Sequence, residues 1–273
     1  MLENSLNARV ATFVRARPAR GGAGLRRVTQ PHIQPMSVPQ EATQLARQLV
    51  TVPLFKNLAP EILGPIIALG RLTPMSAGTF FFTEGDDAER VFVLTSGRVK
   101  LTQLTPEGHH VVLGHIGPGD AFGGVGAFGD PSYPVSAETV EPSVAMAWTS
   151  GTIQHVLETH PTVATNAIRF IADRLHDLQR RYRQLMTERV ERRVARALLR
   201  LVRDAGRRVD TGVEIDFPVS RQDIAEMTGT TLYTVSRLMS SWEERGILSG
   251  GRQHIVLLRA HALVAIAEDL PAS

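Results

Sequence analysis

The sequence predicts an α+β protein with an N-terminal antiparallel β-roll, a long dimerisation helix and a C-terminal winged helix-turn-helix. Three patterns carry this prediction. Short runs of β-forming residues alternate with glycine and proline between residues 71 and 148, and a heptad of apolar residues follows between residues 168 and 185. Between residues 220 and 238, helix-capping residues, a single glycine and apolar residues have the spacing expected for two short helices that cross each other.

Composition places the chain among globular proteins with a sizeable core. Of its 273 residues, 43% are hydrophobic and 21% are charged. No apolar run approaches the roughly 20 residues of a membrane-spanning helix, and arginines interrupt the N-terminus where a secretory signal would be apolar. We therefore expect a cytoplasmic protein with no membrane partner. The absence of cysteine excludes disulfides, thiolate nucleophiles and all-cysteine iron–sulfur clusters.

Charge is distributed unevenly along the chain. Residues 1–37 hold six arginines and one glutamate without apolar periodicity, which predicts a disordered basic extension. Two interpretations stay open for it: a basic arm that contacts DNA, or translation that starts at Met36, which the domain-like sequence after it favours. Residues 71–150 hold four basic and nine acidic residues, whereas residues 151–273 are mildly positive. This pattern indicates an acidic sensor joined to a basic nucleic-acid-binding part.

Residues 38–150 are predicted to form the β-roll. The runs "TFFFTEGD", "RVFVLTSGRVKLTQLT", "HHVVLGHIGPGDAFGG" and "SVAMAW" are rich in Val, Phe, Thr and Leu, and Gly or Pro-Gly separates them. Short strands at even spacing with turn signals favour an antiparallel roll or barrel.

Residues 151–187 are predicted to form the dimerisation helix. Its apolar residues are spaced by 3, 4, 3, 4 and 3, which is the seam of a coiled coil, and charged residues lie between them. A helix packed only on its own domain usually has a wider apolar stripe, so the narrow seam favours a homodimer. The seam consists of Ile168, Ile171, Leu175, Leu178, Tyr182 and Leu185.

Residues 188–273 are predicted to form the DNA-binding domain. A core helix after residue 188 ends at Gly206 and is followed by the segment "SRQDIAEMTGTTLYTVSRLMSSWEERGIL". Ser220 and Asp223 have the spacing of a capping box, Gly229 suits the positive φ of a tight turn, and Thr231 is a natural N-cap for the second helix. Two ordinary helices joined by glycine are the alternative, but they would not require this whole combination.

The second helix has an exposed face at its N-terminal end, which is the end that enters the major groove in a helix-turn-helix. We expect Tyr233, Ser236 and Arg237 on this face to read bases. The following "GILSGGRQHIVLL" predicts a β-hairpin wing with Gly250 and Gly251 at the turn and Arg252 at the tip. Candidate contacts to the DNA backbone are Ser220, Arg221, Gln222, Thr231, Thr234 and Arg252.

These segments resemble the CRP/FNR family, from about Leu54 to Leu263. The resemblance lies in "PLFKNLAPEILG", "GTFFFTEGD", "VLTSGRVKL", "GPGDAFG", "YPVSAETVE", the long helix and the helix-turn-helix. It implies a cyclic-nucleotide-binding-type roll, a homodimer and a transcription regulator, more often an activator, that works with RNA polymerase on double-stranded DNA. "TGTTLYTVSR" without any cysteine also resembles regulators of denitrification that respond to nitric oxide, some through haem.

The chain departs from the family pattern at two sites. In this family the second helix reads bases with Glu, Ser or Gly, and Arg; Tyr233 replaces the Glu, so we expect a half-site that differs from the family consensus at that base. Cyclic-AMP binders use a Glu for the ribose and Arg-Ser for the phosphate. The corresponding effector pocket holds Gly123 and Gly124, and Val135 before Ser136, which argues against a cyclic nucleotide.

The identity of the signal stays open at this level. Haem, another small molecule or gas, and a ligand-free structural roll are the alternatives, and a cyclic nucleotide is the least favoured. The available imidazoles are His109, His110, His115, His155, His160 and His176. No nucleophile–base pair, phosphate-binding loop or carboxylate pair has local support, so we assign no catalytic residue and no metal site and expect no enzyme.

Overall fold

The computed structural model describes residues 49–106, 108, 110–251 and 253–270. The predicted basic extension, the first part of the predicted roll domain, His109 and the wing-tip residue Arg252 lie outside the described residues. No helix in the described part of the chain is long and apolar enough to cross a membrane.

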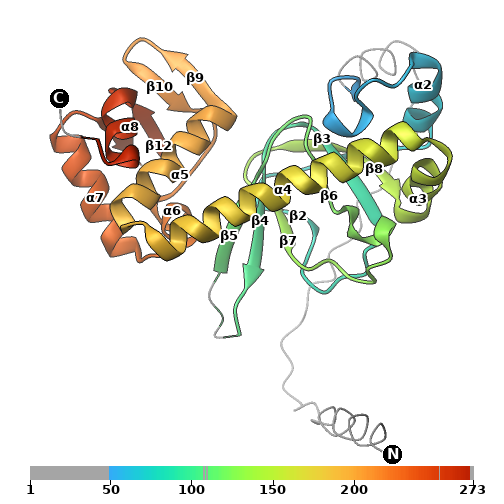
Figure 1. Ribbon diagram of the computed structural model, residues 1–273, viewed down its shortest axis with the longest axis horizontal. Coiled ribbons are helices and arrows are strands. Elements are labelled where there is room, and N and C mark those ends of the chain that lie inside the picture. The colour runs from blue at the N-terminus through green and yellow to red at the C-terminus, as the bar shows by residue number, and fades with distance from the viewer. Residues whose placement is uncertain (1–48, 107, 109, 252, 271–273) are drawn as a thin grey trace, which may run out of the picture. The chain divides into compact units, whose positions relative to one another are not determined.

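Two four-stranded antiparallel sheets form the roll (Figure 1), which confirms the predicted fold of this region. The strand orders are β1-β8-β3-β6 and β2-β7-β4-β5. The strands are β1 Arg71–Met75, β2 Phe80–Phe82, β3 Arg90–Ser96, β4 Val99–Leu104, β5 His110–Ile116, β6 Ala121–Phe122, β7 Ser136–Thr139 and β8 Ser143–Thr149. Helical segments accompany them: η1 Pro53–Phe55, α2 Pro60–Ala68, η2 Gly124–Phe128 and α3 Ser150–Thr159.

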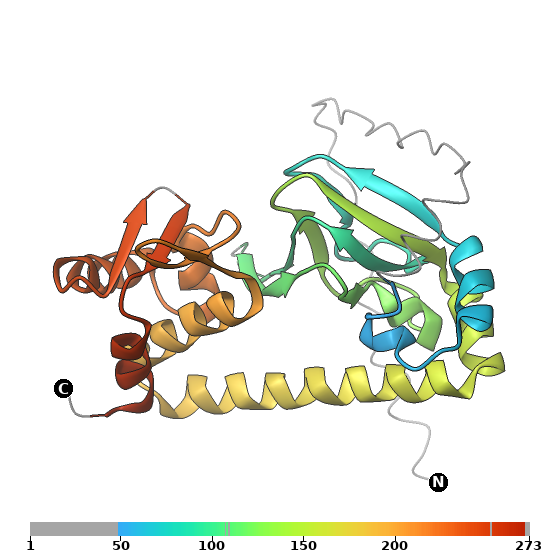
Figure 2. The same cartoon turned by 90° about the horizontal axis from the view of Figure 1, so that it is seen from above.

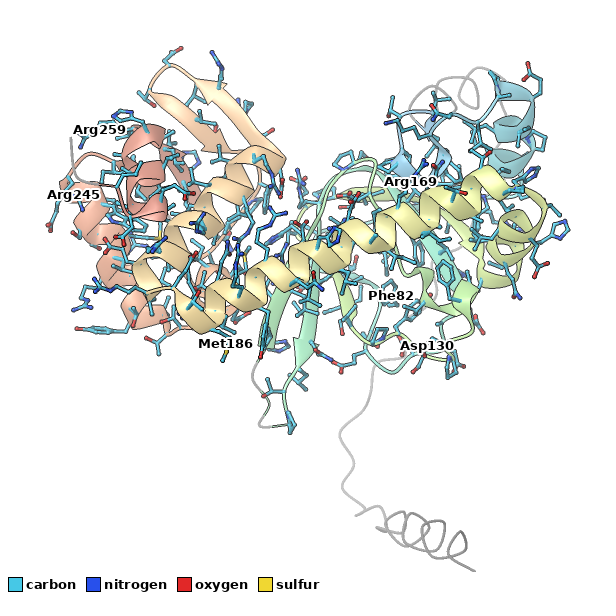
Figure 3. All side chains as sticks on the ribbon, in the orientation of Figure 1. Phe82, Asp130, Arg169, Met186, Arg245 and Arg259 are labelled. Carbon is cyan, nitrogen blue, oxygen red and sulfur yellow. The ribbon has the colours of Figure 1, made fainter. Side chains whose placement is uncertain are left out.

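Aromatic rings fill one of the two cores of the roll. Tyr133 stacks on Phe82 at 3.8 Å between ring centroids, and Phe92 stacks on Phe122 at 5.1 Å. The Tyr133 hydroxyl donates to the carbonyl of Arg90 and accepts from its amide, so the ring is fixed at its polar end as well. Figure 3 labels Phe82 within the roll. The rings of Phe82, Phe122 and Tyr133 line the cavity described below.

The long helix is α4, Pro161–Thr187, which has 27 residues and begins with proline at its first turn. Its N-terminal part is fastened by the buried Asn166, whose amide donates to the carbonyls of Leu54 and Lys56 at 3.2 and 2.7 Å. Figures 1 and 2 show α4 as the yellow helix that leads from the roll into α5. Near its end, Met186 is 66% exposed (Figure 3).

The C-terminal domain packs four helices with a small sheet of order β11-β12-β10-β9. Its core includes the fully buried Trp242, Leu198, Ile224 and Met239. The elements are α5 Val190–Ala205, β9 Gly206–Val209, β10 Gly212–Ile215, α6 Arg221–Thr228, α7 Leu232–Glu244, β11 Leu248–Gly251, β12 His254–Leu257 and α8 Ala260–Glu268.

One detail of the predicted wing was wrong. Gly250 pairs with Ile255 and Gly251 with His254, so both glycines lie in β11 and not at the turn. The chain reverses after Gly251, and Gln253 there has a φ of 63°. Two successive glycines look like a turn in sequence, but the pairing with β12 continues through both of them.

Candidate nucleic-acid interface and sensor cavity

The first helix of the motif, α6, begins at a complete capping box. The Ser220 hydroxyl accepts a hydrogen bond from the Asp223 amide at 3.0 Å, and the Asp223 carboxylate accepts one from the Ser220 amide at 2.9 Å. The helix ends at Gly229, whose φ of 60° lies in the left-handed region. Both features confirm the sequence prediction and fix where α7 begins.

The second helix, α7, buries one face and exposes the other. Thr231 caps it by accepting a hydrogen bond from the Thr234 amide at 3.2 Å. Val235 is fully buried and clamps the helix to the core, whereas Tyr233 is 77% exposed. Arg237 is also exposed and Ser236 is half-buried. The structure therefore brings the three candidate base-reading residues to one accessible face; their contacts with DNA stay a prediction.

The candidate phosphate contacts differ in how free their side chains are. Arg221 forms an ion pair with Glu243 of α7 at 2.8 Å. The Gln222 amide donates to Glu226 at 2.8 Å, and the Thr234 hydroxyl pairs with that of Thr231. A small hollow between the start of α6 and the wing is lined by Ser220, Arg221, Gly251 and Gln253. The ion pair with Glu243 therefore occupies part of the guanidinium that a phosphate contact would use.

The candidate effector residues border a cavity of about 900 Å³. Gly123, Gly124 and Val135 line it, but the Ser136 hydroxyl accepts a hydrogen bond from the Glu84 amide at 2.9 Å instead. Gly123 has a φ of 69°, and a Cβ there would lie 3.0 Å from the rings of Phe82 and Phe92. Gly123 thus lets two aromatic rings approach the backbone closely beside the cavity.

His115 is the histidine, among those described, that lines this cavity. Its ring packs on Phe217 at 4.9 Å between centroids, and its Nδ1 atom is buried without a hydrogen-bond partner. Burial lowers the pKa of His115 to about 4, so its imidazole is neutral at neutral pH. Among the described residues that line the cavity, His115 is the one histidine that could bind the iron of a haem placed there. No cluster of three or more metal-ligating side chains occurs in the described residues.

A contact that the sequence did not reveal joins the roll to the helix-turn-helix. The Lys100 ammonium lies 3.3 Å from Asp223 of the capping box and 3.5 Å from Glu138. Burial alone would lower the pKa of Lys100, but these two carboxylates raise it. The residues are 123 positions apart, so no local pattern could have identified the pair.

Comparisons with known proteins agree with this architecture. A family model described as the Crp-like helix-turn-helix domain matches residues 192–266, and one described as the cyclic nucleotide-binding domain matches residues 72–160. The cyclic AMP receptor protein of Thermus thermophilus is 28% identical over 80% of this chain and 98% of its own length. The transcriptional activator protein anr of Pseudomonas aeruginosa is 25% identical over 76% of this chain and 84% of its own.

Among solved structures, FixK2 from Bradyrhizobium japonicum matches with a TM-score of 0.64 and 25% identity, covering 75% of this chain and 98% of that one. The two family models together span both the roll and the helix-turn-helix, and the relatives share both. The chain therefore belongs to the CRP/FNR family of DNA-binding transcription regulators.

Proposed function

We propose that this regulator acts as a homodimer on a palindromic operator and that a signal received at the roll controls its DNA binding. The observation that carries the proposal is the apolar stripe on α4. All six seam residues are between 48% and 67% exposed in the single chain: Ile168, Ile171, Leu175, Leu178, Tyr182 and Leu185.

We expect this stripe to pack against the same stripe of α4 in a second copy of the chain. The 3-4 spacing needs a partner with the same spacing, because knobs from one helix must enter holes in the other. A two-fold dimer presents two α7 helices, and such a pair binds half-sites separated by about one turn of DNA. The expected operator is therefore a palindrome.

The signal is proposed to differ from cyclic AMP, although the Thermus relative is named for that ligand. Gly124 and Val135 stand where cyclic-AMP binders of the family have Glu and Arg, and Val135 supplies no charge for a phosphate. The contact between Lys100 and Asp223 supports control by the roll, because it ties a roll strand to the first helix of the DNA-binding motif. A constitutive regulator would bind its operator equally with and without any ligand.

The dimer is tested by substitutions that place positive charges in the apolar seam of α4. Leu175→Lys with Leu178→Lys should turn the dimer into a monomer in sedimentation and abolish operator binding. His176→Lys with Gln179→Lys is the matched control, because it adds the same two charges with the same spacing one residue further along the helix. A stable, DNA-binding dimer in the seam variant would refute the proposal.

Haem is tested separately by the absorption spectrum of the purified protein with added haem and nitric oxide under anaerobic conditions. A stoichiometric Soret band that shifts with the gas and is lost in His115→Ala would identify a haem sensor. A spectrum of free haem would remove this alternative.

A further inference from the structure

Among the described residues, five arginines line the cavity, and three of them, from different parts of the chain, are half-buried. Arg98 lies in the turn between β3 and β4 of the roll, Arg181 lies on α4, and Arg200 lies on α5. All three are half-buried, unlike Arg203, which lines the same cavity but has a side chain that is 60% exposed. The cavity therefore has a cationic end built from the sensor, the long helix and the DNA-binding domain.

The hydrogen-bond donors of these arginines are largely unused. Each guanidinium has five N–H donors. Within the described residues, Arg181 donates to the carbonyl of Leu113 and Arg200 donates to Gln184 at 3.3 Å. The Arg98 side chain has no hydrogen-bond partner there; it lies over the ring of Phe217 at 4.7 Å, and its Nε atom is buried and unsatisfied.

Carboxylates line the cavity too, but most of them are paired with other arginines. Asp120 pairs with Arg174 at 3.3 Å, and Asp204 pairs with Arg203 at 2.8 Å. Asp177 pairs with Arg180 at 3.3 Å, and Asp173 is exposed. In the described residues, no carboxylate lies within ion-pair distance of Arg98, Arg181 or Arg200.

Neighbouring positive charges raise the electrostatic energy of Arg200. Burial, together with the charges of Arg181 and Arg203, lowers the pKa of Arg200 to about 10. Burial also lowers the pKa of Arg98 and of Arg181. All three stay charged at neutral pH, and a partly buried cation without a counter-charge is costly. An oxyanion that accepts their hydrogen bonds would remove this cost.

Much of the remaining cavity wall is apolar or aromatic. It includes Leu101, Leu113, Phe122, Tyr133 and Phe170. A ligand that uses both ends therefore needs an apolar body as well as a charged head. None of the three arginines stands at the family's phosphate position, which here is Val135, a residue that lines the same cavity.

We propose that Arg98, Arg181 and Arg200 form the headgroup site for an amphipathic organic anion, a ligand with an apolar or aromatic body and an oxyanion head. Such a ligand would bond simultaneously to the roll, to α4 and to α5. It would thereby fix the DNA-binding domain relative to the sensor. The proposal of a ligand site depends only on the contacts described here. The proposal that this ligand is the regulating signal rests on the function proposed above.

The test uses the purified full-length protein and two fluorescent probes. The anion 8-anilinonaphthalene-1-sulfonate has a sulfonate head on an aromatic body, and N-phenyl-1-naphthylamine has a similar body without the charge. Arg200→Gln and Arg98→Gln should each weaken binding of the anion about tenfold or more, as expected for loss of a charge-assisted bond. Arg203→Gln, the matched control from the same cavity, should weaken it less than twofold. The neutral probe should bind all variants alike.

Equal anion affinity in all variants, or a parallel loss of the neutral probe, would overturn the proposal. Thermal unfolding without ligand gives an independent reading. Arg98→Met should melt at the same temperature as the parent or higher, because it removes a partly buried charge that has no hydrogen-bond or ion-pair partner in the described residues. A lower melting temperature would show that Arg98 serves the fold and would also overturn the proposal.

A third measurement separates this site from the proposed function. Arg237→Ala should lose operator discrimination while it binds the anion like the parent. If no operator is bound but anion binding still depends on Arg200, the proposed function fails and the site stands.

Discussion

The Lys100 ammonium on β4 lies 3.3 Å from the carboxylate of Asp223, the residue that closes the capping box of α6. One carboxylate therefore serves both the start of the helix-turn-helix and its contact with the roll. Burial opposes ionisation of Asp223, but the hydrogen bonds from Ser220 and the charge of Lys100 hold its pKa below the usual range. The carboxylate is thus charged, and the contact is intact, at neutral pH.

Removing the two partners of this contact should have unequal effects on stability. Asp223→Ala loses half of the capping box as well as the ion pair, so it should lower the free energy of unfolding by about 1–2 kcal/mol. Lys100→Met should cost less, because the Asp223 carboxylate keeps its hydrogen bonds from the Ser220 amide and hydroxyl. Urea denaturation measures both, with Lys100→Arg as the control. Equal losses would mean that the cap contributes nothing beyond the ion pair.

His115 should make the protein less stable in acid. Its pKa is about 4 when folded and about 6.5 when unfolded, so the unfolded chain binds more protons between these values. Stability should therefore fall as the pH drops from 7 towards 4, by about 3 kcal/mol at most from this residue. The groups whose charges act on it are Asp223, Arg98, Lys100 and Arg181.

The contribution of His115 is isolated by comparison with His115→Phe, which keeps a ring against Phe217. The difference in unfolding free energy between the parent and this variant should change steeply below pH 6.5. A constant difference from pH 7 to pH 4 would show that His115 is protonated as readily in the folded protein as in the unfolded chain.

Arg237 should discriminate bases. Arg237→Ala is expected to cost about 1–3 kcal/mol of operator affinity and to relax the preference at one base pair, since a bidentate contact to guanine is lost. Tyr233→Glu should shift the selected half-site towards the family consensus. Selection from random DNA measures both. Arg245→Ala, at the opposite end of α7 (Figure 3), is the control and should leave the selected sequence unchanged.

Glu243 should restrain binding to the DNA backbone. It holds Arg221 at 2.8 Å, so Glu243→Gln frees a guanidinium that faces the hollow beside the wing. Affinity for non-specific DNA should rise, and the dependence of log affinity on log salt should steepen by about one. Arg221→Gln in the same background should reverse both changes. If the salt dependence stays constant in Glu243→Gln, Arg221 does not contact phosphate.

The sequence revealed the features that depend on neighbouring residues. The capping box, the turn at Gly229 and the seam of α4 are set by residues within a few positions of one another, and the structure has the first two in place and leaves the seam exposed. Contacts between distant segments were not predictable. Lys100 has no sequence signal that points to Asp223, and Arg98 and Arg200 look like ordinary surface charges until the fold brings them to one cavity. The wing was predicted, but its turn was misplaced because strand register depends on the partner strand.

The two bonds of Asn166 give α4 a fixed point near one end. One amide satisfies two carbonyls of the segment around η1, so this turn of the helix cannot slide without leaving buried polar groups unpaired. From Asn166 to the end of the helix at Thr187 is a rigid arm of about 30 Å at 1.5 Å per residue. A tilt of about 5° at the pivot would displace the far end by roughly 2.6 Å over that length. Because Arg174 and Arg181 also tie α4 to the roll, such a tilt would break those two contacts before it moved the far end of the helix, and the DNA-binding domain that follows it, by this distance.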